Sequence, residues 1–279
     1  MMVMVPVRFV FALAAGAVAW SLATEASAQD ASPWLDDGHS AVRLLAGSRS
    51  GAVLLGGIAF QLQPGWKTYW RTPGDSGVPP RFDFTKSDNI EAVTILWPAP
   101  TRFPDGAGGD SLGYQKHVVL PLRIVVKNPD KPVTLRAAIN YAVCEKICIP
   151  VEASAELSFT SVASTEDGAL SAALDTVPKP ANVGDPTPLT IRDVKRDGKL
   201  GVLVDVVTPD AGEVSLFVEG PTPDWSLPVP KLLDQSPAGV KRFTFDLEGL
   251  PPGANPEGAA LKLTLVGAER SYEFNVNLP

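Results

Sequence analysis

The stretch Val133-Thr134-Leu135-Arg136-Ala137-Ala138-Ile139-Asn140-Tyr141 places an apolar side chain at every second position. A period of two is typical of a β-strand that turns one face towards a core. Short runs of the same kind, bounded by Gly or Pro, recur around it at Ala41–Ala46, Val53–Leu62, Ala92–Trp97, His117–Val126 and Ala153–Thr160. Only Glu166–Thr176 resembles a helix. The pattern predicts an all-β fold, a β-sandwich, rather than an α/β fold.

The second half of the chain repeats this rhythm. Its candidate strands are Leu189–Val194, Leu200–Val207, Glu213–Val218, Arg242–Leu247, Leu261–Val266 and Tyr272–Val276. A Pro-rich stretch, 178–188, separates the halves and has the composition of a linker. We therefore expect two β-sandwich domains in tandem, 29–177 and 189–279. The second contains no Cys and no His, so we expect it to pack or dock rather than to carry chemistry.

Residues 1–28 have the features of an export signal. Arg8 precedes the apolar run Phe9–Ala23, and Ala26-Ser27-Ala28 forms a small-residue cleavage site. The alternative is an uncleaved membrane anchor, but the run is short for a span of about 20 residues and Glu25 closes it. We expect the signal peptide to be cleaved and the product to be soluble and periplasmic, if the source is a Gram-negative bacterium.

Charge and composition exclude several classes of partner. The net charge is −7 and no block of Lys or Arg occurs, so the surface would repel a nucleic-acid backbone. All three methionines lie within the signal, and His39 and His117 are the only histidines. These residues are too few for a Met-rich copper site or an ordinary zinc site. We therefore expect no nucleic-acid partner, no cofactor and no metal.

Both cysteines of the chain follow the opening stretch, in Cys144-Glu145-Lys146-Ile147-Cys148-Ile149-Pro150. A disulfide closing so short a ring contributes only about 2 kcal/mol in the chain-entropy model. Strained or exposed disulfides tend to be the labile or catalytic ones. We interpret Cys144 and Cys148 as a redox centre rather than a structural disulfide. Because Pro150 stiffens the backbone that follows Cys148, we expect Cys148 to be held back in the fold and Cys144 to form the mixed disulfide with a partner.

Two loops are expected in the first half. The run from Gly65 to Pro80 leaves a strand and carries Trp66, Tyr69 and Trp70, which either wall the dithiol or belong to the core. The run 104–114 is rich in glycine and has the composition of a flap. No strand-loop-helix pattern surrounds its glycines, so it is not a phosphate-binding loop.

Three polar side chains are candidates to support the sulfurs. Asp105, if the flap folds over the pair, could accept a proton from a thiol or hold it protonated. Tyr69 or Tyr141 could hydrogen-bond a sulfur. The alternative is that Asp105 is a turn residue and that both tyrosines lie in the core or at its rim.

The order of motifs in the first half carries a resemblance. The motifs are Trp66…Tyr69-Trp70, Pro79-Pro80, Trp97-Pro98-Ala99-Pro100, Leu112-Gly113-Tyr114, Leu120-Pro121-Leu122 and Tyr141…Cys144…Cys148-Ile149-Pro150. This order resembles the N-terminal periplasmic domain of the DsbD and ScsB thiol-disulfide reductases, over roughly Ser40 to Phe159. The resemblance implies an immunoglobulin-like sandwich with Cys144 and Cys148 as its redox pair. It also implies that 104–114 is a flap that shields the pair until a partner docks.

The resemblance also implies partners. Electrons would pass between a membrane electron-transfer protein of the DsbD, ScsB or CcdA type, a thioredoxin-like protein or domain, and periplasmic disulfide acceptors, including those of cytochrome c maturation. The chain ends at Pro279 without a membrane domain or a thioredoxin-like domain, so we expect these to be separate proteins. The three-residue spacing between the cysteines is closer to the ScsB branch. The function implied is a periplasmic thiol-disulfide exchange protein, a component of a protein-disulfide reductase.

Two other classes remain open. A binding module such as an assembly chaperone or an adhesin-like sandwich would keep a static structural disulfide. A Cu(I)-binding protein would use Cys144 and Cys148 as thiolates, although no Met or nearby His is present to complete the site.

Overall fold

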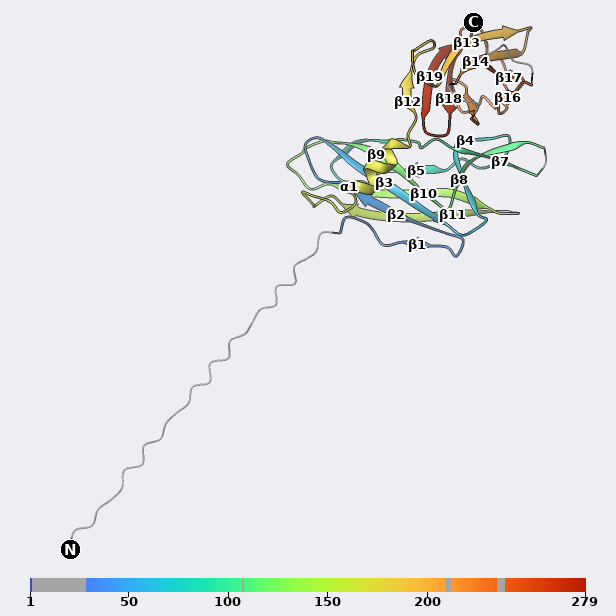
Figure 1. The fold of residues 1–279 in the computed structure, drawn as a ribbon. Helices are drawn as coiled ribbons and strands as arrows, with labels where there is room; N and C mark the ends of the chain where they lie inside the picture. The colour runs from blue at the N-terminus through green and yellow to red at the C-terminus, as the bar shows by residue number, and fades with distance from the viewer. Residues whose placement is uncertain (2–28, 107, 209–211, 235–238) are drawn as a thin grey trace.

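The computed structural model describes residues 1, 29–106, 108–208, 212–234 and 239–279, which form two β-sandwiches (Figure 1). This confirms the all-β, two-sandwich class. The predicted signal peptide, from residue 2 to residue 28, and position 107 of the predicted flap lie outside the described residues. Within the described ranges, no helix is long and apolar enough to cross a membrane.

The first sandwich is built from two antiparallel sheets. Its strands are β1 (Leu35–Asp36), β2 (Ser40–Ala46), β3 (Val53–Leu62), β4 (Lys67–Gly74), β5 (Arg81–Asp83), β6 (Ile90–Ile95), β7 (Thr101–Pro104), β8 (Asp110–Gln115), β9 (His117–Val126), β10 (Thr134–Cys144) and β11 (Cys148–Ser158). One sheet has the order β1-β2-β3-β9-β6, and the other has the order β11-β10-β4-β8-β7, with β5 paired to β10. On β10 the apolar residues of the alternating stretch are buried, as their period predicts.

The second sandwich is also built from two sheets. Its strands are β12 (Lys179–Ala181), β13 (Thr190–Asp197), β14 (Gly201–Val207), β15 (Ser215–Glu219), β16 (Lys231–Leu232), β17 (Lys241–Asp246), β18 (Ala260–Val266) and β19 (Ser271–Asn277). Its sheets have the orders β12-β19-β18-β15 and β13-β14-β17-β16. The linker region 178–188 contributes β12, which pairs in parallel with β19 at the sheet edge. An edge strand tolerates Pro180, which has no N–H to donate.

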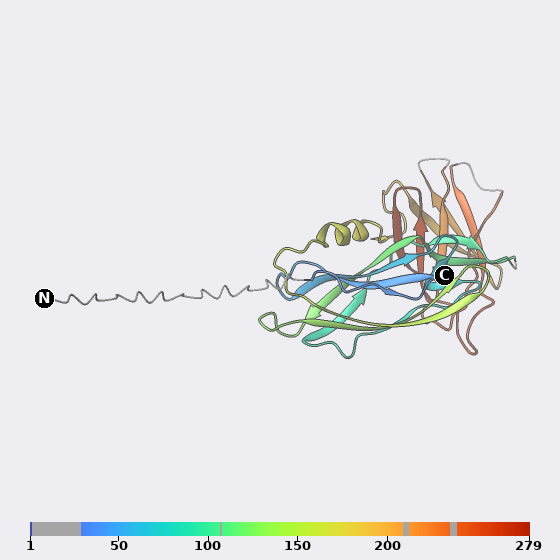
Figure 2. The ribbon, with the colours of Figure 1, turned by 90° about the horizontal axis from the view of Figure 1, so that it is seen from below.

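The predicted helix is present as α1 (Asp167–Asp175). It lies on the sheet that contains β3 and β9, along the outside of the first sandwich (Figure 2). Leu170 and Ala173 supply its buried face and pack with Leu45, Ala59 and Val119.

One predicted loop is instead a strand. Residues 67–74, which the sequence suggested as part of a long loop, form β4 and lie between β10 and β8. Tyr69 and Trp70 are consecutive, yet both are buried, with 4% and 0% of their surface exposed. A strand that is covered on both faces loses the apolar-polar alternation by which a strand is recognised.

The run proposed as a flap is also largely strand, because β7 and β8 form a hairpin. Gly113 of β8 lies so close to β4 that a Cβ added there would be 2.0 Å from the carbonyl oxygen of Thr68. The glycine in this run therefore permits close strand pairing. Whether the hairpin shields the cysteines stays a prediction.

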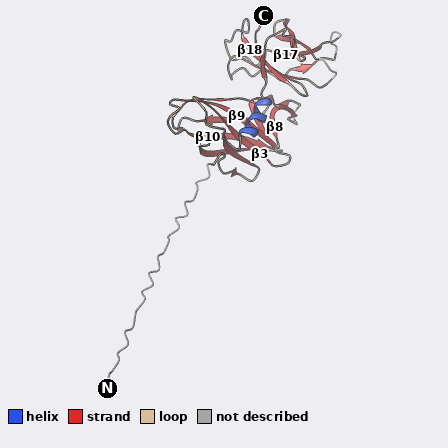
Figure 3. Ribbon diagram, turned by 60° about the vertical axis from the view of Figure 1, so that its left-hand side comes forward, coloured by secondary structure: helices blue, strands red, loops and turns tan. Residues whose placement is uncertain are grey.

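The two sandwiches touch on the side of the first where β4 and β7 lie (Figure 1). Figure 3 shows the two sandwiches, one beyond the other, from another side. Phe217 and Val229 of the second sandwich belong to the same buried cluster as Trp70 of the first. The rings of Trp70 and Phe217 are 6.0 Å apart between centroids. Apolar side chains are thus shared across the junction between the domains.

Candidate functional site

The two cysteines form a disulfide at the end of a β-hairpin. Cys144 is the last residue of β10 and Cys148 the first of β11, and the two are direct partners in the antiparallel register. Only Glu145, Lys146 and Ile147 lie between them, and all three are exposed. The three residues between the cysteines therefore form a tight hairpin turn, and this turn brings the two sulfurs together.

The two sulfurs belong to residues of very different exposure. Cys144 is 3% exposed and packs with Tyr69 and Ala142, whereas Cys148 is exposed. The expectation that Cys148 is held back in the fold is therefore wrong. The reason is the strand order: β10 is covered by β4, while β11 is an edge strand, so the residue that begins it meets solvent. The stiffness that Pro150 gives the chain does not decide burial.

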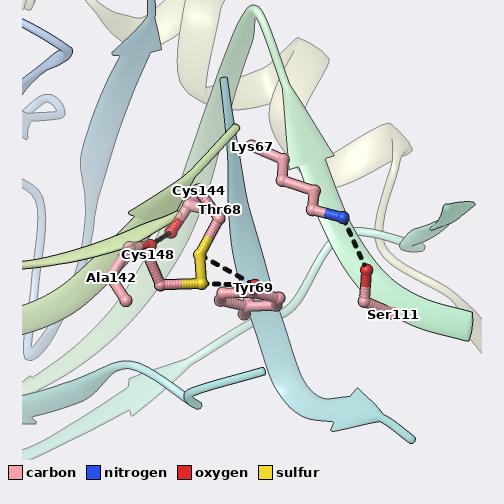
Figure 4. The surroundings of a disulfide bond; sticks show 7 residues. All are labelled: Lys67, Thr68, Tyr69, Ser111, Ala142, Cys144 and Cys148. Atoms are coloured by element: carbon pink, nitrogen blue, oxygen red, sulfur yellow. Dashed lines mark hydrogen bonds between the residues drawn. A yellow bond between two sulfur atoms is a disulfide. The ribbon is translucent and has the colours of Figure 1, made fainter. Parts of the chain in front are cut away.

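Tyr69 is brought to the disulfide by β4, as Figure 4 shows. Its hydroxyl donates a hydrogen bond to Cys144 Sγ at 2.9 Å and lies 3.3 Å from Cys148 Sγ. Burial raises the pKa of Tyr69, so the phenol stays protonated and remains a donor at neutral pH. Of the three supporting residues suggested by the sequence, Tyr69 is the one with a hydrogen bond to sulfur among the contacts described.

The strand that carries Tyr69 is fixed beside the cysteines. Lys67 is in register with Cys144, and the hydroxyl of Thr68 donates to the carbonyl oxygen of Ala142 at 3.0 Å. On the other side of β4, Lys67 Nζ donates to Ser111 Oγ of β8 at 3.0 Å. These bonds tie the start of β4, the segment that leads into Tyr69, to both neighbouring strands.

Tyr141 lies elsewhere. It is 3% exposed, its ring meets Phe60 edge-on, and its hydroxyl is 2.8 Å from Ser40 Oγ and donates to Asp37 Oδ2 at 3.4 Å. Burial raises the pKa of Tyr141 to about 12. Because it precedes Cys144 by three residues along β10, it points to the opposite face of the strand. Its described contacts are those of a core tyrosine.

Asp105 lies in the turn between β7 and β8. Its Oδ1 accepts the backbone N–H of Gly109 at 2.9 Å, a contact that shapes the turn. The neighbouring Asp75 accepts the N–H of Asp110 at 2.9 Å and that of Val229, in the second sandwich, at 3.3 Å. The contact with Gly109 is that of a turn aspartate, and the role of Asp105 beside a thiol stays a prediction.

Sequence reasoning missed three features near the site. Ile147, in the turn between the cysteines, is 70% exposed, which makes it one of the most exposed large apolar residues described. Trp66 stacks on His39 with ring centroids 4.1 Å apart, and the side chain of Glu145 lies against Gly65. No sequence pattern could have paired positions so far apart as 39 and 66. Within the described ranges, no group of three or more His, Cys, Asp or Glu residues could hold a metal ion.

Comparisons with known proteins bear on the family and the fold of the chain. The family model described as "Thiol:disulfide interchange protein DsbD, N-terminal" matches residues 41–160. The crystal structure of the N-terminal periplasmic domain of ScsB from Proteus mirabilis is similar, with a TM-score of 0.71 and 23% sequence identity, over 89% of this chain and 98% of that one. Such coverage extends beyond residue 160, so the likeness in fold includes the second sandwich.

A second solved structure, the yeast GGA1 GAE domain, has a TM-score of 0.28 and 9% sequence identity, over 45% of this chain and 97% of that one. So low a score supports no argument. The search of curated proteins found no match.

Proposed function

Since residues 41–160 form a domain of the DsbD N-terminal family, we propose that this protein exchanges thiols and disulfides with other proteins through Cys144 and Cys148. It relays electrons between a thioredoxin-like donor and acceptor proteins. The observation that carries the proposal is the asymmetry of the disulfide. One cysteine is exposed, and its partner is 3% exposed beneath a tyrosine hydroxyl.

The exposed residue is where a partner can attack. A thiolate of the donor attacks Cys148 Sγ, the bond between the sulfurs breaks, and Cys144 leaves as a thiolate. The hydroxyl of Tyr69 already donates to Cys144 Sγ, so it stabilises the negative charge that forms there. A leaving group whose thiol has a lower pKa leaves faster. Tyr69 therefore assists both the bond cleavage and the stability of the reduced form.

The second half of the reaction restores the donor as a disulfide. The other thiolate of the donor attacks its own sulfur in the mixed disulfide and releases Cys148 as a thiolate. Two electrons have then moved from the donor dithiol to this protein. Delivery to an acceptor is the reverse sequence: Cys148 attacks the acceptor disulfide, and Cys144 resolves the intermediate. Cys148 is thus the exchanging cysteine and Cys144 the resolving one, the opposite of the assignment made from the sequence.

The partners and location belong to the same proposal. The domain match and the likeness to a periplasmic domain of ScsB support a periplasmic location. The donor is a thioredoxin-like protein or domain supplied with electrons by a membrane protein of the DsbD, ScsB or CcdA type, and the acceptors are periplasmic disulfides.

Trapping tests the proposal. The Cys144→Ser variant cannot resolve its mixed disulfide, so it should accumulate a covalent complex with a thioredoxin-like protein when expressed in the periplasm. The matched Cys148→Ser variant should trap little, since its remaining cysteine is buried. Non-reducing electrophoresis and mass spectrometry identify the complex. Trapping by Cys148→Ser alone would reverse the roles of the sulfurs, and trapping by neither variant would count against the relay.

A further inference from the structure

Beyond Tyr69, strand β4 loses the backbone partners that hold its beginning. Its pairing with β10 covers Lys67 and Thr68, and its pairing with β8 shifts between Tyr69 and Gly74. The four intervening residues, 70–73, have no partner in either register. Side chains from another part of the molecule also hold this part of the strand.

Those side chains belong to the second sandwich. Arg71 donates from Nε and Nη2 to the two carboxylate oxygens of Glu219, at 2.8 and 2.7 Å, and from Nη2 to Glu273 Oε2 at 2.6 Å. The hydroxyl of Thr72 also donates to Glu219, at 3.0 Å. We call Arg71, Glu219 and Glu273 the interdomain clamp. The guanidinium of Arg71 also lies over the ring of Trp70, 4.4 Å from its centroid.

The clamp is well formed for holding a strand in place. Its three side chains are only 16–24% exposed, and the paired contacts with Glu219 fix the direction of the guanidinium as well as its distance. Glu219 lies on β15 and Glu273 on β19, so two strands of one sheet grip the same residue. Lys262, on the strand between them, lies 3.3 Å from Glu273 and fixes that carboxylate in turn.

Arg71 is two positions beyond Tyr69 on β4, so the clamp holds the strand within two residues of the tyrosine. A second connection runs through the segment that follows. Asp75 accepts a hydrogen bond from Val229 of the second sandwich, and two residues later Gly77 lies against the ring of Tyr69. A Cβ added at Gly77 would be 2.4 Å from Tyr69 Cε1. The tyrosine is thus held between two points that the second sandwich fixes.

We infer that the second sandwich positions Tyr69 against the disulfide through the clamp, which makes Arg71 a positioning residue for thiol-disulfide exchange although it touches neither sulfur. The inference rests on the proposed function and gives the redox-inactive domain a part in it. When the clamp is broken, β4 is free to shift beyond its last paired residue. The hydroxyl of Tyr69 then donates less well to the Cys144 thiolate.

The test measures how fast dithiothreitol reduces the disulfide of the full chain at about pH 8. Samples are taken over time, their thiols are alkylated, and the reduced fraction is measured by mass spectrometry. Tyr69→Phe should slow reduction about tenfold, as expected for losing a hydrogen bond to a charged group. Arg71→Gln should slow it roughly threefold, since the donor is displaced rather than removed. The double variant should be no slower than Tyr69→Phe alone, because both changes act through one hydroxyl. Arg71→Lys should recover only part of the rate, because lysine lacks the forked geometry.

Arg242→Gln is the matched control. Arg242 also donates from Nε and Nη2 to the two carboxylate oxygens of one residue, Asp205, at 2.6 and 2.8 Å, but both residues lie within the second sandwich, on β17 and β14. Its variant should be reduced at the rate of the wild type. The inference is overturned if Arg71→Gln lowers the unfolding midpoint while leaving the rate unchanged, if its effect adds in full to that of Tyr69→Phe, or if Arg242→Gln slows reduction equally. The reduction assay needs no protein partner, because dithiothreitol is the reductant. A failure to trap a partner protein would therefore count against the relay but would leave the measured reduction rates valid.

Discussion

Replacing Tyr69 by Phe should make the disulfide harder to reduce. The ring is kept, so packing in the site is preserved, and the one group removed is the hydroxyl that lies 2.9 Å from Cys144 Sγ and 3.3 Å from Cys148 Sγ. In the oxidised protein this hydroxyl faces neutral sulfur, which is a weak acceptor. Reduction converts Cys144, which is 3% exposed in the disulfide form, to a thiol or thiolate, and few waters can replace the hydroxyl at so buried a position.

The size of the effect follows from that difference. A hydrogen bond to a charged group contributes about 1.5–3 kcal/mol. For a two-electron couple, about 1.4 kcal/mol corresponds to about 30 mV, so the reduction potential of Tyr69→Phe should be about 30–60 mV more negative. The shift should be largest at about pH 9 and shrink at about pH 6, because a protonated thiol gains less from the donor. Burial raises the pKa of Tyr69, which keeps the donor protonated across this range.

The assay is equilibration with a glutathione redox buffer, with the reduced fraction measured after alkylation. Tyr141→Phe is the matched control: it makes the same chemical change at a buried hydroxyl whose partners are Ser40 and Asp37. Its potential should equal that of the wild type. An unchanged potential for Tyr69→Phe at about pH 9, or an equal shift in Tyr141→Phe, would refute the argument. A wild-type bond that stayed oxidised through the whole titration would favour a static structural disulfide.

Three further outcomes are expected. A fragment of residues 29–177 should fold with a lower unfolding midpoint than the full chain in urea and with a more slowly reduced disulfide, because Trp70 loses its neighbour across the junction; failure to fold would make the second sandwich integral to the first. Hydrogen bonds from Arg242 lower the pKa of Asp205. The ionised carboxylate therefore stabilises the fold at pH values above its ordinary pKa, and this stabilisation is lost as the pH falls through the lowered pKa. In urea titrations, Asp205→Asn should lose less stability than the wild type below about pH 4, and an unchanged pH dependence would contradict this. Gly113→Ala should lower the free energy of unfolding by about 1–3 kcal/mol, because its Cβ would meet the backbone of β4, and a neutral effect would contradict the close approach.

Local patterns in the sequence determined much of the fold. Strands β3 and β9 have the bounds that alternation and turn residues predicted, and α1 lies within the predicted helix. The sequence was enough to interpret the two cysteines as a redox pair, and the structure places them opposite each other at the end of a hairpin. These features depend on neighbours in the chain, whose periodicity and spacing can be read directly.

The tertiary structure alone decided what surrounds the disulfide. Strand β4 could not be recognised from the sequence, because its residues are covered on both faces, in part by the second sandwich, and do not alternate between apolar and polar. Cys148 is exposed because β11 is an edge strand, and Cys144 is buried because β10 is an inner strand. The order of strands in a sheet cannot be predicted from the local alternation of apolar and polar residues. Arg71 finds its acidic partners 148 and 202 positions later in the chain. Contacts over such separations form only when packing brings the strands together. No local sequence pattern could therefore have predicted the interdomain clamp or the roles of the two sulfurs.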